Sequence, residues 1–165
     1  MPIPSMPDDY PALLEKARQQ YEAAFHLLHV TFPLVKDSKL LLGVVNNIFS
    51  SLEYSMSAIL NYERQLHLVP HYFDNFQSKL NLFRYKSVRR NNIPMETVNL
   101  MMELKALLEL HKKSPMEFQR GGRLVICSQD YHLRTLSIKD LHVHLARAKE
   151  LLNQADNIIK IDRKQ

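Results

Sequence analysis

The sequence has few of the residues that mark tight turns, disulfide frameworks or membrane spans. Only three glycines occur in 165 residues, too few for the many turns of an all-β fold, so helices are the expected elements. A single cysteine, Cys127, excludes a disulfide framework within the chain and fits a reducing compartment. No stretch approaches about 18 uninterrupted apolar residues, and the opening MPIPSMPDDY lacks the features of a signal peptide. The sequence therefore predicts a cytoplasmic protein that does not contact membranes.

Length and composition are those of an ordinary globular protein. Hydrophobic residues make up 45% of the chain and charged residues 24%. A chain of this length can bury one hydrophobic core. We therefore predict a single helical-bundle domain over residues 1–165, with a short flexible leader at 1–8 and a flexible tail at 162–165.

Apolar residues recur with the period of helices from the beginning of the chain. Asp9 and Pro11 predict the start of a first helix, and Pro33 is expected to end it or bend it. A second helix is predicted over residues 40–66, with Asp37 or Ser38 as its cap. The apolar positions of the first helix are Leu14, Ala17, Tyr21, Ala24 and Leu28.

The second helix is predicted to be central because its apolar stripe is long. Serines make the middle of this helix narrow, which favours close approach by another helix, from this chain or from a second copy. The stripe consists of Leu41, Val45, Ile48, Leu52 and Ile59, widened by Val44, Phe49, Met56 and Leu60. The small residues are Ser50, Ser51, Ser55, Ser57 and Ala58.

Three more helices are predicted after Pro70. The third carries Phe73, Phe76, Leu80 and Phe83 on its inner face, and the fourth covers residues 95–113. Ser137 is expected to cap the last helix, with Asp140 in the capping-box position. The last helix has the most regular stripe of the chain: Ile138, Leu141, Leu145, Ala148, Leu152, Ala155 and Ile159.

Residues 117–136 differ from the rest, because their pattern is that of β-strands. Gly121-Gly122 fits a two-residue hairpin turn, which predicts that Arg120 faces Arg123 and that Phe118 faces Val125. Residues 131–136 can return as a third strand. The predicted fold is therefore mainly α: a five-helix bundle with a small β-hairpin or three-stranded ribbon, at about 117–136, before the last helix.

Basic residues gather in the second half of the chain. Residues 1–74 hold five Lys and Arg against eight Asp and Glu, whereas residues 75–165 hold seventeen against nine, so the net charges are −3 and +8. Lys and Arg gain affinity by displacing counterions from phosphates. A polyanion is one expected partner, and a solvated basic surface without a partner is the alternative. The residues predicted to contact an anion are Lys79, Arg84, Lys86, Arg89, Arg90, Arg120, Arg123 and Arg134.

The motifs of common enzymes and cofactor sites are missing from the sequence. It has no glycine-rich phosphate loop, no nucleophile elbow and no paired-cysteine motif. The pairs His26 and His29, and His67 and His71, have no carboxylate or cysteine at ligand spacing. We therefore expect no metal site and no cofactor.

One resemblance is carried by the segment NNIFSSLEYSMSAILNYERQL at residues 46–66. This long, small-residue-rich helix in a five-helix architecture resembles HEPN domains, helical proteins of prokaryotic defence and toxin systems that often dimerise and cleave or bind RNA. Their catalytic signature, an Arg followed after four to six residues by His, is matched here by Arg64 and His71, with polar Gln65 after the Arg. Pro70 inside the motif departs from the helical setting of that family.

Three functions therefore remain open. The first is a non-enzymatic protein that binds an anionic partner, RNA being the expected one, through its basic surface. The second is an HEPN-like ribonuclease, or an inactive relative of one, in which Arg64 and His71 are the implied catalytic pair. The third is a structural homodimer or protein-interaction module without a role on nucleic acid.

Overall fold

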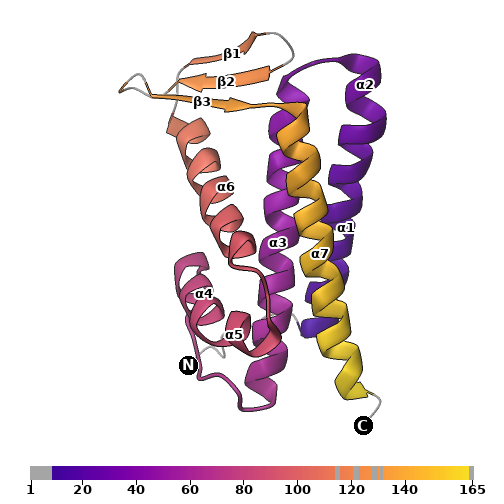
Figure 1. Cartoon of the computed structure of the whole chain (residues 1–165), viewed down its shortest axis with the longest axis vertical. Coiled ribbons are helices and arrows are strands. Elements are labelled where there is room, and N and C mark those ends of the chain that lie inside the picture. The colour runs from indigo at the N-terminus through magenta and orange to yellow at the C-terminus, as the bar shows by residue number, and fades with distance from the viewer. Residues whose placement is uncertain (1–8, 114–115, 121–122, 128–129, 131, 164–165) are drawn as a thin grey trace, which may run out of the picture.

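The computed structural model describes residues 9–113, 116–120, 123–127, 130 and 132–163. Long helices run roughly along its long axis, and a small sheet lies at one end (Figure 1). In chain order the elements are α1 (Tyr10–His26), the π turn η1 (Leu27–Thr31), α2 (Phe32–Val35), α3 (Lys39–Gln65), α4 (Phe76–Leu82), the π turn η2 (Phe83–Ser87), α5 (Val88–Asn91), α6 (Met95–Lys113), β1 (Met116–Arg120), β2 (Arg123–Cys127), β3 (Leu133–Leu136) and α7 (Ile138–Arg163).

The predicted fold class is confirmed. The segments α1, η1 and α2 follow one another without a break, as do α4, η2 and α5, so the helical part consists of five helices. The strands stand before the last helix and form a three-stranded sheet. The predicted leader at 1–8 lies outside the described residues. Of the predicted tail, 162 and 163 belong to α7, so the helix reaches further than expected.

Short polar side chains start the helices. The Asp9 carboxylate accepts a hydrogen bond from the Tyr10 amide at 2.9 Å, and Asp37 accepts one from the Lys39 amide at 3.0 Å. Asn75 accepts from the Ser78 amide at 2.9 Å, so α4 begins at Phe76. The prediction that Phe73 lies on the inner face of this helix is wrong, because Phe73 precedes the cap and its side chain is exposed.

Pro33 does not end the first helix. Proline has no N–H to donate and crowds the preceding turn, which ordinarily breaks an α-helix. Here the wider π turn η1 comes just before Pro33, and the helix continues to Val35. The chain then turns at Lys36, whose backbone is left-handed with φ 55°.

Helix α3 is the centre of the bundle, as predicted. All nine apolar residues of its predicted stripe are buried. Helix α1 packs on its small residues: the buried Ser51 hydroxyl donates to the Ala17 carbonyl at 2.9 Å. Gly43 leaves room for Leu27, whose Cδ2 would lie only 3.0 Å from a Cβ at that position. The close approach predicted for the serine-rich face is therefore made by α1 of the same chain.

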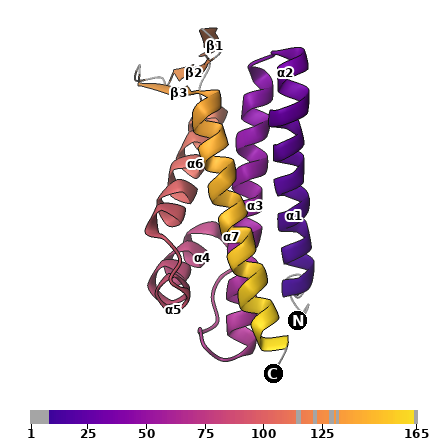
Figure 2. The same cartoon turned by 45° about the vertical axis from the view of Figure 1, so that its right-hand side comes forward.

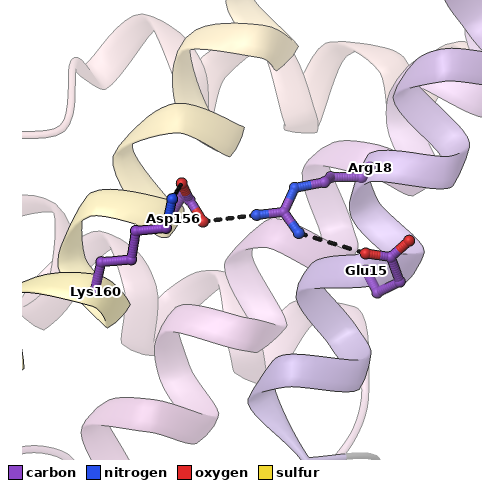
Figure 3. Close-up of polar contacts among 4 residues, drawn as sticks. All are labelled: Glu15, Arg18, Asp156 and Lys160. Atoms are coloured by element: carbon purple, nitrogen blue, oxygen red, sulfur yellow. Dashed lines mark hydrogen bonds and ion pairs between the residues drawn. The ribbon is translucent and has the colours of Figure 1, made fainter. Parts of the chain in front are cut away.

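Helix α7 packs on α3 and α1 with the stripe that its sequence predicts. Six of the seven stripe residues, from Leu141 to Ile159, are buried, and Ile138 is partly buried against the same core. An ion-pair network joins α7 to α1 at the surface (Figure 3). In it, Asp156 contacts Arg18 at 2.6 Å and Lys160 at 2.8 Å, and Arg18 also contacts Glu15 at 3.4 Å.

The sheet has the register that the sequence predicts. Its order is β1-β2-β3 with antiparallel neighbours, and Arg120 faces Arg123 while Phe118 faces Val125. The Gly121-Gly122 turn itself lies outside the described residues. Leu124 and Ile126 of β2 are buried in the main core, which anchors the sheet on the end of the bundle. A hairpin needs such support to be stable.

The start of α7 confirms the predicted capping box. The Asp140 amide donates to the Ser137 hydroxyl at 3.1 Å, and the Ser137 amide donates to the Asp140 carboxylate at 3.4 Å. The hydrogen bond with Ser137 lowers the pKa of Asp140 below its usual value of 3.8. The charged carboxylate is therefore favoured by folding.

Replacing Ser137 with alanine is expected to lower the free energy of unfolding by about 1 kcal/mol at neutral pH. Because folding lowers the pKa of Asp140, its contribution is complete above pH 3.8 and is lost as the pH falls through the folded-state value. The difference between parent and variant should therefore shrink on acidification, as measured by urea melts across this range. Ser137→Thr keeps the hydroxyl and is the control; an equal loss in both variants would contradict the capping role.

Among the described residues, no helix is long and apolar enough to cross a membrane.

Candidate anion-binding site

The C-terminal end of α3 is closed by backbone hydrogen bonds around His67. The His67 amide donates to the Arg64 carbonyl at 3.0 Å, and the Leu68 amide donates to the Glu63 carbonyl at 2.8 Å. These two bonds define a Schellman motif, in which the residue after the cap adopts the left-handed conformation. His67 occupies that position with φ 59°.

Histidine at this position is unusual. Glycine is the common residue after the C-cap, because it has no Cβ to crowd the carbonyl in the left-handed region. Other residues in sparsely populated backbone regions cost on the order of 1 kcal/mol, and such residues concentrate at functional sites. The left-handed backbone therefore makes His67 a candidate functional residue.

His67 lines a cavity of about 410 Å³ together with residues from two segments of the chain. Arg64 comes from the last turn of α3, and Lys86 comes from the π turn η2. We call this hollow the Arg64 cavity; its lining is Arg64, His67, Leu68, Val69, Pro70, His71 and Lys86. Four of these residues are basic, and none of the described lining residues is acidic. The predicted pair Arg64 and His71 is thus brought to one site.

Arg64 is held in place by an aromatic ring. Its guanidinium carbon lies 5.3 Å from the centre of the Tyr72 ring, within the range of a cation–π contact. Burial raises the pKa of the Tyr72 phenol, and the Arg64 charge offsets part of that rise. Tyr72 therefore stays neutral beside the cavity and does not cancel the charge of Arg64.

A buried carboxylate fixes the wall of the cavity. Glu63 is only 1% exposed, and its two carboxylate oxygens accept hydrogen bonds from the Ser87 hydroxyl and the Arg90 guanidinium. Arg90 also donates to the Leu68 carbonyl at 3.1 Å. This cluster ties the end of α3, the following loop and α5 together, so His67 and Lys86 face one space.

Two of the residues predicted to contact an anion form ion pairs with carboxylates of the same chain. Lys79 does not offer the exposed charge that an anion contact requires: it is buried, donates to Ser57 at 3.0 Å and pairs with Asp74 at 3.3 Å. Glu53 is a further partner at 3.8 Å. Arg90 is paired with Glu63. The charges of these two side chains are balanced within the fold.

The other residues of α4, η2 and α5 that were predicted to contact an anion differ in exposure. Lys86 and Arg89 are exposed, three residues apart. Arg84 is partly buried; its Nε has no hydrogen-bond partner, and its guanidinium carbon lies 5.4 Å from the centre of the Tyr85 ring. Lys86 and Arg89 are therefore the residues of this helix best placed to meet a large anion.

The ribbon arginines lie at the opposite end of the bundle. The sheet stands beyond the start of α7, whereas α4 and α5 lie near the other end of the long axis (Figures 1 and 2). Arg120, Arg123 and Arg134 are exposed there. The hydrogen bond with Ser137 has the largest effect on the pKa of Asp140, and the positive charge of Arg123 lowers this pKa further. The ribbon arginines and the third helix therefore lie at different ends of the bundle.

His67 was not predicted as an anion-binding residue. In the sequence, its spacing to His71 raised only the question of a metal site. Among the described residues, no group of three potential ligands can hold a metal ion. One signal was present: the segment RQLHLVPH ends a helix before Pro70 without a glycine, so a left-handed turn at this end would have to use another residue.

No model of a protein family matches the chain, and searches of curated proteins and of solved structures find no match either.

Proposed function

We propose that this chain binds single-stranded RNA, without cleaving it, at the Arg64 cavity. The observation that carries the proposal is the convergence of Arg64, His67, His71 and Lys86 on one space with no described acidic lining residue. Arginine and lysine bind phosphate through charge-assisted hydrogen bonds. Exposed Arg89 extends the same basic surface along the third helix.

The position of the cavity sets a requirement on the side chains. A helix C-terminus carries a partial negative charge, which attracts cations and opposes anions. The dipole of α3 therefore favours Arg64 at this place, and a phosphate needs several cations to outweigh it. The lining meets this requirement, because Arg64 and Lys86 both line the cavity and Glu63 is already paired with Arg90.

The proposal is tested with a fluorescently labelled single-stranded RNA of about 6 nucleotides, a length typical of one binding site. Affinity is measured by anisotropy over a range of salt concentrations. Each phosphate contact contributes about 0.7 to the slope of log affinity against log salt for single strands. Arg64→Ala and Lys86→Ala should each flatten the slope by about that amount. Equal slopes in parent and variants would contradict the proposed site.

The distant ribbon provides the matched control. Replacing Arg120 and Arg123 together removes two exposed cations at the other end of the bundle, so the slope for the short RNA should not change. A longer RNA tests whether these arginines and Arg134 make a second contact. Absence of saturable binding by the parent at low salt would remove the RNA function and leave the structural homodimer as the better interpretation.

His67→Gly separates binding from stability in the same assay. Glycine adopts the left-handed conformation without the steric cost of a Cβ, so the free energy of unfolding should stay the same or rise by up to about 1 kcal/mol. The affinity for RNA should fall, because the imidazole is lost from the cavity. Lys36→Gly is the matched control, because Lys36 is also basic and left-handed but lies outside the Arg64 cavity. It should keep the RNA affinity of the parent.

A second candidate function, RNA cleavage, is favoured by the shared position of Arg64 and His71 in the cavity. In a metal-independent mechanism a histidine accepts the proton of the 2′-hydroxyl, and an arginine stabilises the charge that develops on the phosphate. The RNA from the binding assay is therefore analysed on denaturing gels, and we expect it to stay intact. Cleavage without metal that disappears in folded His71→Ala would replace the binding function by a ribonuclease.

A further inference from the structure

A second cavity is lined by residues of η1, of α2 and of the first turns of α7. In Figure 1, α2 and the start of α7 lie at the end of the molecule that carries the sheet. Its volume is about 440 Å³, which is within the range of small-molecule sites. We call it the His29 cavity. Its lining is Leu28, His29, Phe32, Pro33, Lys36, Ile138 and His142.

The floor of the His29 cavity is apolar. Leu28 and Phe32 are buried in the core, and Ile138 of α7 is partly buried against them. The cavity occurs beside the π turn η1, which contains Leu28 and His29, and beside Pro33. A π turn widens the helix by one residue, and such turns are frequent at functional sites.

The rim is basic. The His29 ring is tilted against Phe25 at 4.2 Å between ring centres, and its other contact is an edge-to-face approach to His142 at 4.8 Å. These contacts place the two imidazoles side by side. Lys36 adds an exposed ammonium group at the end of α2. None of the described lining residues is acidic. The nearby Asp37 carboxylate accepts a hydrogen bond from the Lys39 amide.

We propose that the His29 cavity binds a small amphipathic carboxylate, such as a medium-chain fatty acid. Its alkyl chain would lie on Leu28, Phe32 and Ile138, and its carboxylate would meet His29, His142 and Lys36. An apolar floor with a few convergent polar groups is the usual composition of a small-molecule site. The basic rim without a described acidic residue selects an anionic head group. This proposal is independent of RNA binding at the Arg64 cavity.

The test compares octanoate with octanol, which has the same chain but no charge, by titration calorimetry. Octanoate should bind in a one-to-one ratio with a dissociation constant on the order of 0.1–1 mM, as expected for a ligand of this size. Octanol should bind about tenfold more weakly, because it lacks the charge-assisted contacts. Equal affinity for both, or no saturable binding of octanoate, would overturn the proposal.

Substitutions at the rim assign the site. Lys36→Gln and His142→Gln change exposed side chains and should leave the fold intact, which circular dichroism verifies. Each should reduce octanoate affinity by about threefold to tenfold and leave octanol affinity unchanged. Lys39→Gln, three residues from Lys36 and outside the lining, is the control. A loss in Lys39→Gln equal to that in Lys36→Gln would show general charge attraction and overturn the assignment.

Discussion

Replacing Arg90 with alanine is expected to lower the free energy of unfolding by about 3 kcal/mol. The loss arises because Glu63, which is 1% exposed, would lose its cationic partner in the interior and retain the hydrogen bond from the Ser87 hydroxyl. Breaking a buried pair from one side is costly for this reason. We place the effect near the lower end of the usual range because the Arg90 side chain is itself 34% exposed. Urea melts measure the difference.

Two further variants test whether the loss of stability arises because Glu63 is left without a cationic partner. Glu63→Gln removes the charge and keeps an oxygen that accepts from Ser87, so its loss should be smaller than that of Arg90→Ala. Arg89→Ala removes an exposed neighbouring arginine and should change stability by less than about 0.5 kcal/mol. If Arg90→Ala costs no more than Arg89→Ala, Glu63 does not depend on Arg90.

Leu145→Ala is expected to cost about 2–5 kcal/mol, because the side chain is 3% exposed in the interface of α7 with the bundle. The range reflects how far the surrounding side chains can close the space left behind. Guanidinium melts monitored by circular dichroism give the loss.

Val143→Ala is the control on the same helix. Its side chain is 58% exposed, so the substitution should cost less than about 0.5 kcal/mol. A loss below that value for Leu145→Ala as well would mean that α7 does not bury its stripe in solution.

The helices and the sheet could be predicted because their signals are local in the sequence. The stripe from Leu141 to Ile159 repeats at steps of three and four, and the Ser137 and Asp140 pair stands at its start. The Gly121-Gly122 pair in the sequence predicts a two-residue turn and, with it, the pairing of Arg120 with Arg123 that the register of β1 and β2 has.

The partners of charged residues could not be predicted in the same way. Lys79 is buried because Ser57, Glu53 and Asp74 reach it from α3 and from the preceding loop. Arg90 meets Glu63, which is 27 positions earlier. Side-chain periodicity places a residue on a face of its own helix but does not say which charge lies opposite. The basic surface predicted from composition was therefore larger than the one that remains available.

The candidate site was predicted in part. Arg64 and His71 were matched by their spacing and Lys86 by its charge, and all three line the Arg64 cavity. His67 was not predicted from the sequence as a lining residue, and its left-handed backbone occurs where α3 ends before Pro70 without a glycine. The π turns η1 and η2 carry no sequence signal that we recognise.

The two π turns give the two cavities the same sensitivity to a change in chain length. Each contains one residue more than an α-helical turn requires, and each contributes to a cavity: His29 in η1 and Lys86 in η2. Deleting the extra residue from either turn would restore a regular helix without rotating the residues beyond it, because the wide turn already absorbs that residue. The deletion would instead change the width of the turn, and with it the position of His29 in η1 or of Lys86 in η2. A deletion that makes the helix more regular would therefore alter the lining of the neighbouring cavity.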